Sequence, residues 1–378
     1  MRQRRSILLI HPNFLWGGSE VVMLYILKAL YKKYDVTIFC NLNIKKNLIK
    51  IKKVFDINLE ENFFNIRLSK FNTNYPRLNK NLSTRFIKSE LIDFDMYLTT
   101  QGFINLNCKS FHYIHYPPKS YLSKKQKAYT RDSLISKLKN SILDFISNEK
   151  KYDSSQKNHK FICNSNWTLR GLKKEKNIKS SNISVIYPPV TLLNYNKNKK
   201  ELNSFIAISR IVPEKNITDI IYILDELWKE NKDIKSTIIG STSEMQLEYL
   251  NKIERMVSER DHIKLKKNVS RNIMVRELTK SQFGIHAMKN EHFGISNIEM
   301  FSAGVIPFIP NEGGQVEIHP LKECIYKNNK DAIKKIKEFF KINPRELDLL
   351  SLRLSEYSLK FSNKKFVKNI QNHIKENA

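Results

Sequence analysis

One stretch of the sequence decides the fold: residues 283–309, which read FGIHAMKNEHFGISNIEMFSAGVIPFI. The apolar runs at its two ends, 283–288 and 305–309, are typical of buried strands of a parallel sheet. The residues between them, which include Gly294 and the Ser-Ala-Gly triplet at 302–304, predict a loop that enters a helix. The stretch therefore predicts a strand-helix-strand unit, and ligands of such sheets collect at the carboxyl ends of the strands.

Two carboxylates and a glycine make this loop a candidate site. Glu291 and Glu299 are separated by seven residues, so one is expected just before the helix and the other two turns inside it, facing the same crevice. Gly294 lets backbone come close to a ligand, and the first N–H groups of a helix attract anions. Two glutamates at this spacing also arise by chance. Their position on a glycine-containing loop, between a parallel strand and a helix N-terminus, nevertheless predicts a phosphate site.

Length and composition limit the classes of protein. The chain has 378 residues, which suits two domains, and 41% of them are hydrophobic, which excludes a disordered basic tail. Lys and Arg exceed Asp and Glu by 66 to 37, a net charge of +29 that predicts an anionic partner. The four cysteines form no C-x-x-C pair, which disfavours a zinc site and suits a reducing compartment. Neither a membrane span nor a signal peptide is predicted.

The first half of the chain opens with a strand, a turn and a helix. Residues 6–10 are a continuous apolar run, and Gly17 and Gly18 precede an amphipathic helix that extends to Leu30. A glycine pair at this point lets the backbone turn tightly beside a ligand at a helix N-terminus. The third glycine of the nicotinamide fingerprint is absent. Further strands are predicted at residues 35–40, 96–100, 111–116 and 160–164.

Two other features of this half are candidates for function. His115 lies at the end of a predicted strand, before two prolines, where it could bind a substrate hydroxyl or serve as a structural residue. Residues 123–146 alternate basic and apolar side chains at helical spacing, a pattern that suits packing on the same domain or an acidic bilayer surface. Residues 41–90 predict only mixed short elements.

The second half repeats the alternation of strands and helices. Strands are predicted at residues 204–209, 237–240, 263–265, 283–288, 305–309 and 324–326, and Arg210 and Lys215 lie on the turn after the first of them. Two successive series of alternating strands and helices predict an α/β protein of two Rossmann-like domains that face a cleft. The predicted boundaries are 1–192 for the first domain, 193–203 for a linker, 204–345 for the second domain, and 346–378 for helices that return to the first.

Taken in order, these residues resemble glycosyltransferase family 4 over nearly the whole chain. Glu291 and Glu299 match its E-x7-E signature, and the run GGQVEI at residues 313–318 matches its second glycine turn. Within the family, YIHYP at residues 113–117 and NEHFGIS at residues 290–296 are most similar to enzymes that add mannose to dolichol-linked oligosaccharide on the cytosolic face of the endoplasmic reticulum. The resemblance implies the two-domain fold called GT-B and transfer with retention of anomeric configuration.

The resemblance also implies how the second domain would hold a nucleotide sugar. Arg210 and Lys215 would bind the diphosphate, and the amides around Phe293, Gly294 and Ile295 would meet the phosphate and the sugar. Such groups stabilise the negative charge that builds on the departing diphosphate. Arginine offers a planar fork for phosphate oxygens, and lysine offers a compact charge.

The remaining implied roles concern the sugar and the first domain. Glu299 would hold the ribose hydroxyls, and Glu291 would touch the donor hexose. Gly17 and Gly18 would lie against the diphosphate, and His115 would lie near the sugar and the acceptor. The residues leave open whether Glu291 acts as a covalent nucleophile or whether the acceptor attacks from the same face.

With two cations and two helix ends at the diphosphate, no metal is predicted to be required. The D-x-D triplet at residues 93–95, which other glycosyltransferases use for a divalent ion, is interpreted as a surface coincidence because it lies outside both glycine turns.

The leading hypothesis is a retaining glycosyltransferase that moves a hexose, mannose from GDP-mannose above all, to a lipid-linked or membrane-associated glycan. Its basic first domain would bind an anionic membrane surface, which places it in the cytoplasm, peripheral at the membrane. A glycosyltransferase that uses UDP-glucose or UDP-N-acetylglucosamine, or a nucleotide-sugar epimerase, fits the same fold. A nucleic-acid-binding protein would fit the charge, but no recognition motif is present and no nucleic acid is predicted as a partner.

Overall fold

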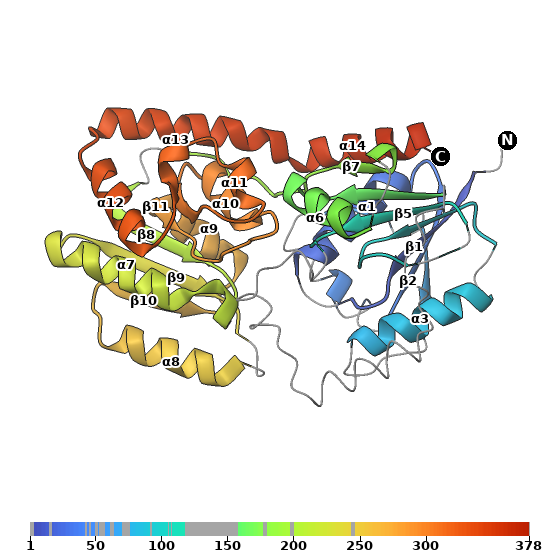
Figure 1. Ribbon diagram of the computed structural model, residues 1–378, viewed down its shortest axis with the longest axis horizontal. Helices are drawn as coiled ribbons and strands as arrows, with labels where there is room; N and C mark the ends of the chain where they lie inside the picture. The colour runs from blue at the N-terminus through green and yellow to red at the C-terminus, as the bar shows by residue number, and fades with distance from the viewer. Residues whose placement is uncertain are drawn as a thin grey trace. The chain divides into compact units, whose positions relative to one another are not determined.

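The computed structural model describes two compact units, residues 1–189 with 363–378 and residues 190–362 (Figure 1). Each unit is built on one parallel sheet. The described residues are 4–14, 17–41, 44, 47–49, 52, 57–60, 64–69, 76–90, 93–104, 106, 108–117, 158–176, 180–196, 200–242 and 246–377. The basic amphipathic stretch expected at residues 123–146 lies outside them.

The sheet of the first unit has the strand order β3-β2-β1-β4-β5-β6-β7, and every neighbouring pair is parallel. Its order reverses between β1 and β4, which is the position where ligands of doubly wound sheets bind. The strands are β1 Ser6–His11, β2 Asp35–Cys40, β3 Phe64–Leu68, β4 Met96–Thr99, β5 Ser110–Ile114, β6 His159–Cys163 and β7 Ile183–Val185.

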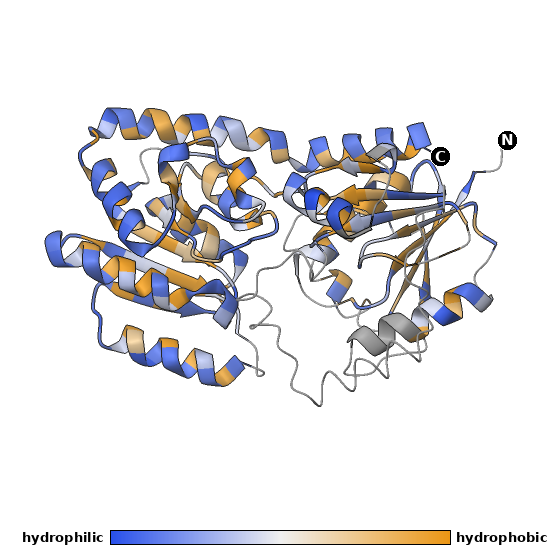
Figure 2. Ribbon diagram, viewed as in Figure 1, coloured by the Kyte–Doolittle hydropathy of each residue, from blue (hydrophilic) through white to orange (hydrophobic). Residues whose placement is uncertain are grey.

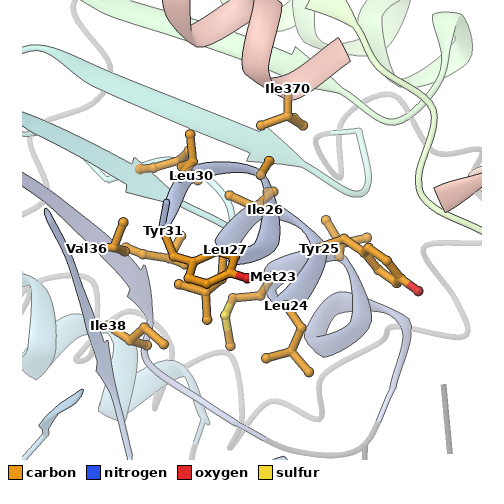
Figure 3. Packing of buried hydrophobic residues seen from close by; sticks show 14 of the residues in the cluster. Met23, Leu24, Tyr25, Ile26, Leu27, Leu30, Tyr31, Val36, Ile38 and Ile370 are labelled. Carbon is orange, nitrogen blue, oxygen red and sulfur yellow. The ribbon is translucent and has the colours of Figure 1, made fainter. Parts of the chain in front are cut away.

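Helices pack on this sheet through apolar side chains. Almost every residue of α1 (Gly18–Leu30) is buried, and the last helix, α14 (Asn363–Asn377), packs directly against it. Phe366, Ile370 and Ile374 of α14 belong to the same core as α1, and Figure 3 shows Ile370 close to the α1 side chains. The other helices of this unit are α3 Pro76–Glu90, α6 Asn166–Lys176 and the 3-10 turn η3 Ser180–Asn182. The return of the C-terminal helix to the first unit is therefore confirmed.

The second unit has a parallel sheet of six strands in the order β10-β9-β8-β11-β12-β13, with the reversal between β8 and β11. Figure 2 shows that the strands of this sheet are apolar and that the helices around it carry both polar and apolar residues. A helix that buries one face and exposes the other has this mixed composition. The strands are β8 Glu201–Ile208, β9 Lys235–Gly240, β10 Ile263–Lys267, β11 Ser281–Ile285, β12 Ile306–Pro310 and β13 Ile325–Tyr326. The helices are η5 Pro213–Lys215, α7 Ile217–Glu230, α8 Leu247–Ser258, α9 Arg271–Lys280, α10 Ile295–Ser302, α11 Gln315–Ile318, η7 Lys322–Cys324, α12 Asn329–Phe340, α13 Pro344–Ser358 and η8 Leu359–Phe361.

The two Rossmann-like sheets that the sequence predicts are confirmed, whereas the unit boundaries differ from the expected ones. The second unit begins at Val190, and the expected linker 193–203 runs into β8, which starts at Glu201. Helix α13 belongs to the second unit because it packs on α10, where the ring of Tyr357 meets that of Phe301, 6.4 Å between centroids. The expected cleft between the units stays a prediction.

None of the helices in the described ranges combines the length and the apolar character that a membrane crossing requires.

Candidate active site

The loop between β11 and α10 ends in a turn that requires glycine. Gly294 has φ +97°, and a Cβ there would lie 2.7 Å from Nδ2 of Asn297. Helix α10 begins at the next residue, Ile295, and its third N–H group, that of Asn297, donates to the carbonyl oxygen of Gly294 at 3.0 Å, so only the N–H groups of Ile295 and Ser296 have no acceptor within the helix. Glu291 precedes this helix as expected, but Glu299 lies just over one turn inside it and not two, because the helix starts only at Ile295. The turn therefore carries a glycine with positive φ followed by a helix N-terminus, and the binding of an anion there stays a prediction.

Glu291 forms the centre of a buried polar cluster at the switch point of the second sheet. Its Oε2 lies 2.6 Å from Nζ of Lys215, which follows β8, and both side chains are about one-seventh exposed, 15% and 14%. The same oxygen lies 3.3 Å from Nε2 of His286, which directly follows β11. Its Oε1 accepts a hydrogen bond of 3.1 Å from the backbone N–H of His292. The reversal of strand order between β8 and β11 thus brings together groups that are 76 positions apart.

The surroundings of Glu291 decide its charge. Burial alone would favour the protonated acid, but Lys215 and His286 outweigh it and hold the pKa of Glu291 well below its ordinary value. Burial also lowers the pKa of His286 and of His292, so both rings are neutral near pH 7. The cluster therefore holds one ammonium and one carboxylate beside neutral imidazoles.

A second glycine turn, after β12, is fixed to the backbone of Glu291. Gly313 has φ +90°, and a Cβ there would lie 2.4 Å from the carbonyl oxygen of Glu291. The N–H of Gly314 donates to that same oxygen at 2.7 Å. The Gly-Gly pair that the sequence singled out therefore positions Glu291 through its main chain.

Two buried amide side chains connect the two turns. Nε2 of Gln315 donates to the carbonyl oxygens of Met288 (2.9 Å) and Glu312 (3.1 Å). Its Oε1 accepts a 3.3 Å hydrogen bond from Nδ2 of Asn297 in the first turn of α10. Within the described residues, Oδ1 of Asn297 has no hydrogen-bond partner although the residue is fully buried. Such an acceptor in native proteins usually meets a ligand or a water molecule.

Glu299 is held by a different cation. Nη1 of Arg271, at the start of α9 after β10, lies 2.5 Å from Oε1 of Glu299. Burial raises the pKa of Glu299, and Arg271 only partly offsets this effect. The two carboxylates of the signature are thus paired to separate cations on separate loops.

Arg210 and Phe293, two other predicted donor-binding residues, also follow the carboxyl ends of strands in this sheet, but they differ in exposure. The Arg210 side chain is 66% exposed and lies 3.7 Å from Glu214, its one ionic partner among the described residues, whereas Lys215 is mostly buried. Phe293 is buried and its ring packs 5.7 Å from that of Phe361, so its contribution to a ligand would come from the main chain.

The glycine pair of the first unit also lies at a switch point. Gly17 is the N-cap residue of α1 and has extended backbone, φ −178°, and Gly18 is the first residue of the helix. Close to this turn, Glu20 is 2% exposed, and its Oε1 lies 3.3 Å from Nε2 of His11 at the end of β1. Thr100 after β4 completes the connection, with its Oγ1 2.6 Å from Nδ1 of His11.

His115 follows β5 in the same unit. Its carbonyl oxygen accepts a 2.7 Å hydrogen bond from Nδ2 of Asn164, and its ring lies 5.0 Å from that of Tyr113. It is therefore positioned at the carboxyl edge of the sheet, beside the strand that borders the switch point.

Asp95 of the D-x-D triplet lies at the opposite edge. Its Oδ2 accepts hydrogen bonds from the backbone N–H (2.7 Å) and the hydroxyl (2.9 Å) of Ser6, the first residue of β1. These bonds lower the pKa of Asp95. The carboxylate thus holds the start of a strand, far from the carboxyl ends where ligands bind.

Sequence reasoning missed several residues of these clusters: His11, Glu20, Arg271, His286, Asn297 and Gln315. His286 carried one signal, because a polar ring directly after an apolar strand marks the ligand-binding edge of the sheet. Arg271 carried none, because its helix begins in a stretch with several other basic residues.

Comparisons with known proteins show what the chain is similar to. Residues 193–358 match the family model "Glycosyl transferases group 1". GDP-Man:Man(3)GlcNAc(2)-PP-Dol alpha-1,2-mannosyltransferase of Dictyostelium discoideum is 25% identical over 82% of this chain and 72% of that protein. The human protein of the same name is 24% identical over 79% and 70%.

Solved structures share the fold over nearly the whole chain. A glycosyltransferase of Rickettsia africae has a TM-score of 0.67 at 16% identity, over 99% of this chain and 98% of that one. The Anabaena protein HepE in complex with UDP-glucose has a TM-score of 0.67 at 12% identity, over 98% and 99%. Residues 193–358 are therefore a glycosyltransferase group 1 domain, and the chain has the GT-B fold and is a glycosyltransferase enzyme.

Proposed function

We propose that this glycosyltransferase moves mannose from GDP-mannose to a lipid-linked glycan, with retention of anomeric configuration. The single observation that carries the proposal is the pairing of Lys215 with Glu291 beside the N-terminus of α10. A cation and the first N–H groups of a helix match a diphosphate, and the adjacent carboxylate matches the hydroxyls of a sugar. The names of the relatives in Dictyostelium and human supply the donor and the class of acceptor.

The proposed mechanism follows from where charge develops. An acceptor hydroxyl oxygen attacks the anomeric carbon, the bond from that carbon to the diphosphate oxygen breaks, and the acceptor proton passes to the departing diphosphate. Lys215, Arg210 and the N–H groups of Ile295 and its neighbours would stabilise the diphosphate, which gains negative charge in this step. Glu291 would hold the hexose and Glu299 the ribose. We propose that these groups suffice without a metal, so that activity persists in a chelator.

The first unit would supply the acceptor side. His115 and the turn at Gly17 and Gly18 lie at the carboxyl edge of its sheet, where a ligand is expected. The excess of 66 basic over 37 acidic residues would attract an anionic bilayer that carries the acceptor lipid. We therefore propose a peripheral position on the cytoplasmic face of a membrane, which flotation with anionic and with neutral vesicles would test.

The decisive experiment is a donor panel. The purified chain is incubated with GDP-mannose, UDP-glucose and UDP-N-acetylglucosamine, each with and without a Man(3)GlcNAc(2) pyrophosphate lipid in anionic vesicles. We expect acceptor-dependent release of GDP and an elongated glycan. Release of UDP from a UDP-sugar would identify that sugar, and not GDP-mannose, as the donor. Interconversion of nucleotide sugars without an acceptor would indicate an epimerase. If the chain bound none of the nucleotide sugars, the proposal would be overturned.

A further inference from the structure

His286 is a buried imidazole whose position the proposed chemistry does not yet explain. It is 4% exposed and lies at the carboxyl end of β11, with its Nε2 directed toward Oε2 of Glu291 at 3.3 Å. That contact is long and poorly aligned, and within the described residues Nε2 makes no hydrogen bond of good geometry. A buried donor without a good acceptor costs free energy, so its retention calls for a reason.

The protonation state of this ring follows from its other contacts. The backbone N–H of Met288 donates to Nδ1 at 3.1 Å, which requires a lone pair on Nδ1 and places the hydrogen of a neutral ring on Nε2. A second proton on Nδ1 would face that N–H and break the bond. The charged groups near the ring are Lys215 and Glu291, and Tyr326 of β13 donates to the backbone oxygen of His286 at 2.7 Å. His286 is therefore a neutral donor aimed at Glu291.

Lys215 is the other side-chain donor to the Glu291 carboxylate. Its Nζ lies 2.6 Å from the same Oε2 and has the better geometry. A donor diphosphate carries more negative charge than Glu291 and would draw the ammonium away. Glu291 would then be a buried carboxylate with one of its partners removed, which is strongly unfavourable unless another donor takes the place of Lys215.

We propose that His286 is a positioning residue that takes over Oε2 of Glu291 when Lys215 turns to the diphosphate of the donor. This inference rests on the proposed function and adds a residue that the reaction does not touch. In the ligand-free protein Lys215 holds the carboxylate, and in the donor complex the imidazole N–H holds it. Glu291 thus keeps its charge and orientation toward the sugar in both states.

The chain contains a matched control for this experiment. His319 is also buried, and its Nδ1 also accepts from the backbone N–H two residues later, that of Leu321, at 3.2 Å. Its Nε2 meets a carbonyl oxygen, that of Pro307, at 2.8 Å and not a carboxylate. Replacement of His319 by Phe therefore removes a buried imidazole with the same Nδ1 contact, outside the cluster.

The test compares His286→Phe, His286→Gln and His319→Phe by GDP affinity, thermal stability and the pH profile of kcat/KM with GDP-mannose. Glutamine retains a neutral donor, whereas phenylalanine removes it. Activity that needs ionised Glu291 is lost as pH falls through the depressed pKa of Glu291, so removal of a donor moves the acidic limb of the profile upward. We expect an upward shift of about one pH unit and a turnover about tenfold lower in His286→Phe.

His286→Gln is expected to return the acidic limb of the pH profile to its wild-type position and to restore most of the turnover. His319→Phe is expected to lower thermal stability and to leave the acidic limb where it is in the wild type. An unmoved limb in a folded, active His286→Phe protein would overturn the inference and leave the proposed function intact. Failure of the wild-type chain to bind GDP would instead remove the proposed function.

A spectroscopic measurement on the unmodified chain makes the inference independent of how the variants fold. In 15N-labelled protein, the Nε2-bound proton of His286 is expected to shift downfield when GDP is added, because its hydrogen bond to Glu291 shortens. The ring should stay neutral near pH 7, because burial lowers the pKa of His286. An unchanged resonance on saturation with GDP, or a charged ring, would contradict the proposal.

Discussion

The two units present the same topological feature with different chemistry. In the first sheet the strand order reverses between β1 and β4, and in the second between β8 and β11. The first switch point has a glycine pair at a helix N-terminus beside a buried acid, Glu20, which His11 and Ser19 contact. The second has glycine turns beside a carboxylate that is paired with a lysine, Lys215.

This difference shows that the sheet determines where a ligand binds, and the side chains determine which ligand. A helix N-terminus attracts an anion in both units, but Oε2 of Glu20 lies only 3.3 Å from the position of a Cβ on Gly17 and opposes one there. At the second switch point Lys215 adds to the attraction. The affinity for the diphosphate is accordingly expected to come more from the second unit than from the contact predicted for Gly17 and Gly18.

The largest effect is expected from Lys215→Ala. The change removes the buried cation that would meet the diphosphate, so turnover with GDP-mannose should fall by about a hundredfold. It also removes the only cation paired with Glu291 among the described residues, which should lower the free energy of unfolding by about 3 kcal/mol. Steady-state kinetics and denaturant unfolding measure the two effects. Lys266→Ala, which breaks the pair with Glu277, is the matched control and should retain full turnover.

Gly313→Ala is the next largest change. A side chain at φ +90° is strained, and its Cβ would overlap the carbonyl oxygen of Glu291, so the free energy of unfolding should fall by about 3 kcal/mol. Urea denaturation provides the value. An alanine variant as stable as the wild type would show that this turn is not fixed to Glu291 as described.

Glu299→Ala tests the other carboxylate of the signature. If Glu299 holds the ribose hydroxyls through charged hydrogen bonds, kcat/KM for GDP-mannose should fall by about a hundredfold. Glu277→Ala removes another paired, partly buried glutamate of the same unit and serves as the control. Equal losses in the two variants would indicate a structural role for Glu299 with Arg271 in place of a contact with the nucleotide.

The smallest effect is expected from Gly17→Ala. Its extended backbone suits any residue, and the new Cβ would come no closer than 3.3 Å to Oε2 of Glu20, so stability should change by less than about 1 kcal/mol. If the backbone here contacts the diphosphate, KM for the donor should rise by about tenfold. An unchanged KM would assign donor binding to the second unit alone.

Much of the fold could be predicted because buried parallel strands are continuous apolar runs. Residues 6–10, 35–40 and 305–309 became β1, β2 and β12 with small shifts at their ends. Strand β3 and helix α3 were missed because residues 41–90 are rich in Lys and Asn, and three consecutive residues of β3 are exposed, so no burial pattern marks them. Helix α13 was assigned to the wrong unit because its amphipathic pattern does not say which core it packs on.

The two glycine turns of the site could be predicted from the residues, whereas the pairing of its side chains could not. Gly294 and Gly313 stood out because turns with positive φ select glycine. The partners of Glu291 and Glu299 were not predictable, because Lys215 and Arg271 lie on other loops and reach these carboxylates only once the strand order is known. The sequence predicts the same role for Arg210 and Lys215, but in the structure the Arg210 side chain is exposed and that of Lys215 is mostly buried.

The most direct test of the central claim is a crystal structure of the chain with GDP-mannose bound. The account predicts that the two phosphates contact Nζ of Lys215 and the first N–H groups of α10, with Lys215 released from Glu291. A nucleotide bound elsewhere in the chain, with the contact between Lys215 and Glu291 intact, would contradict it.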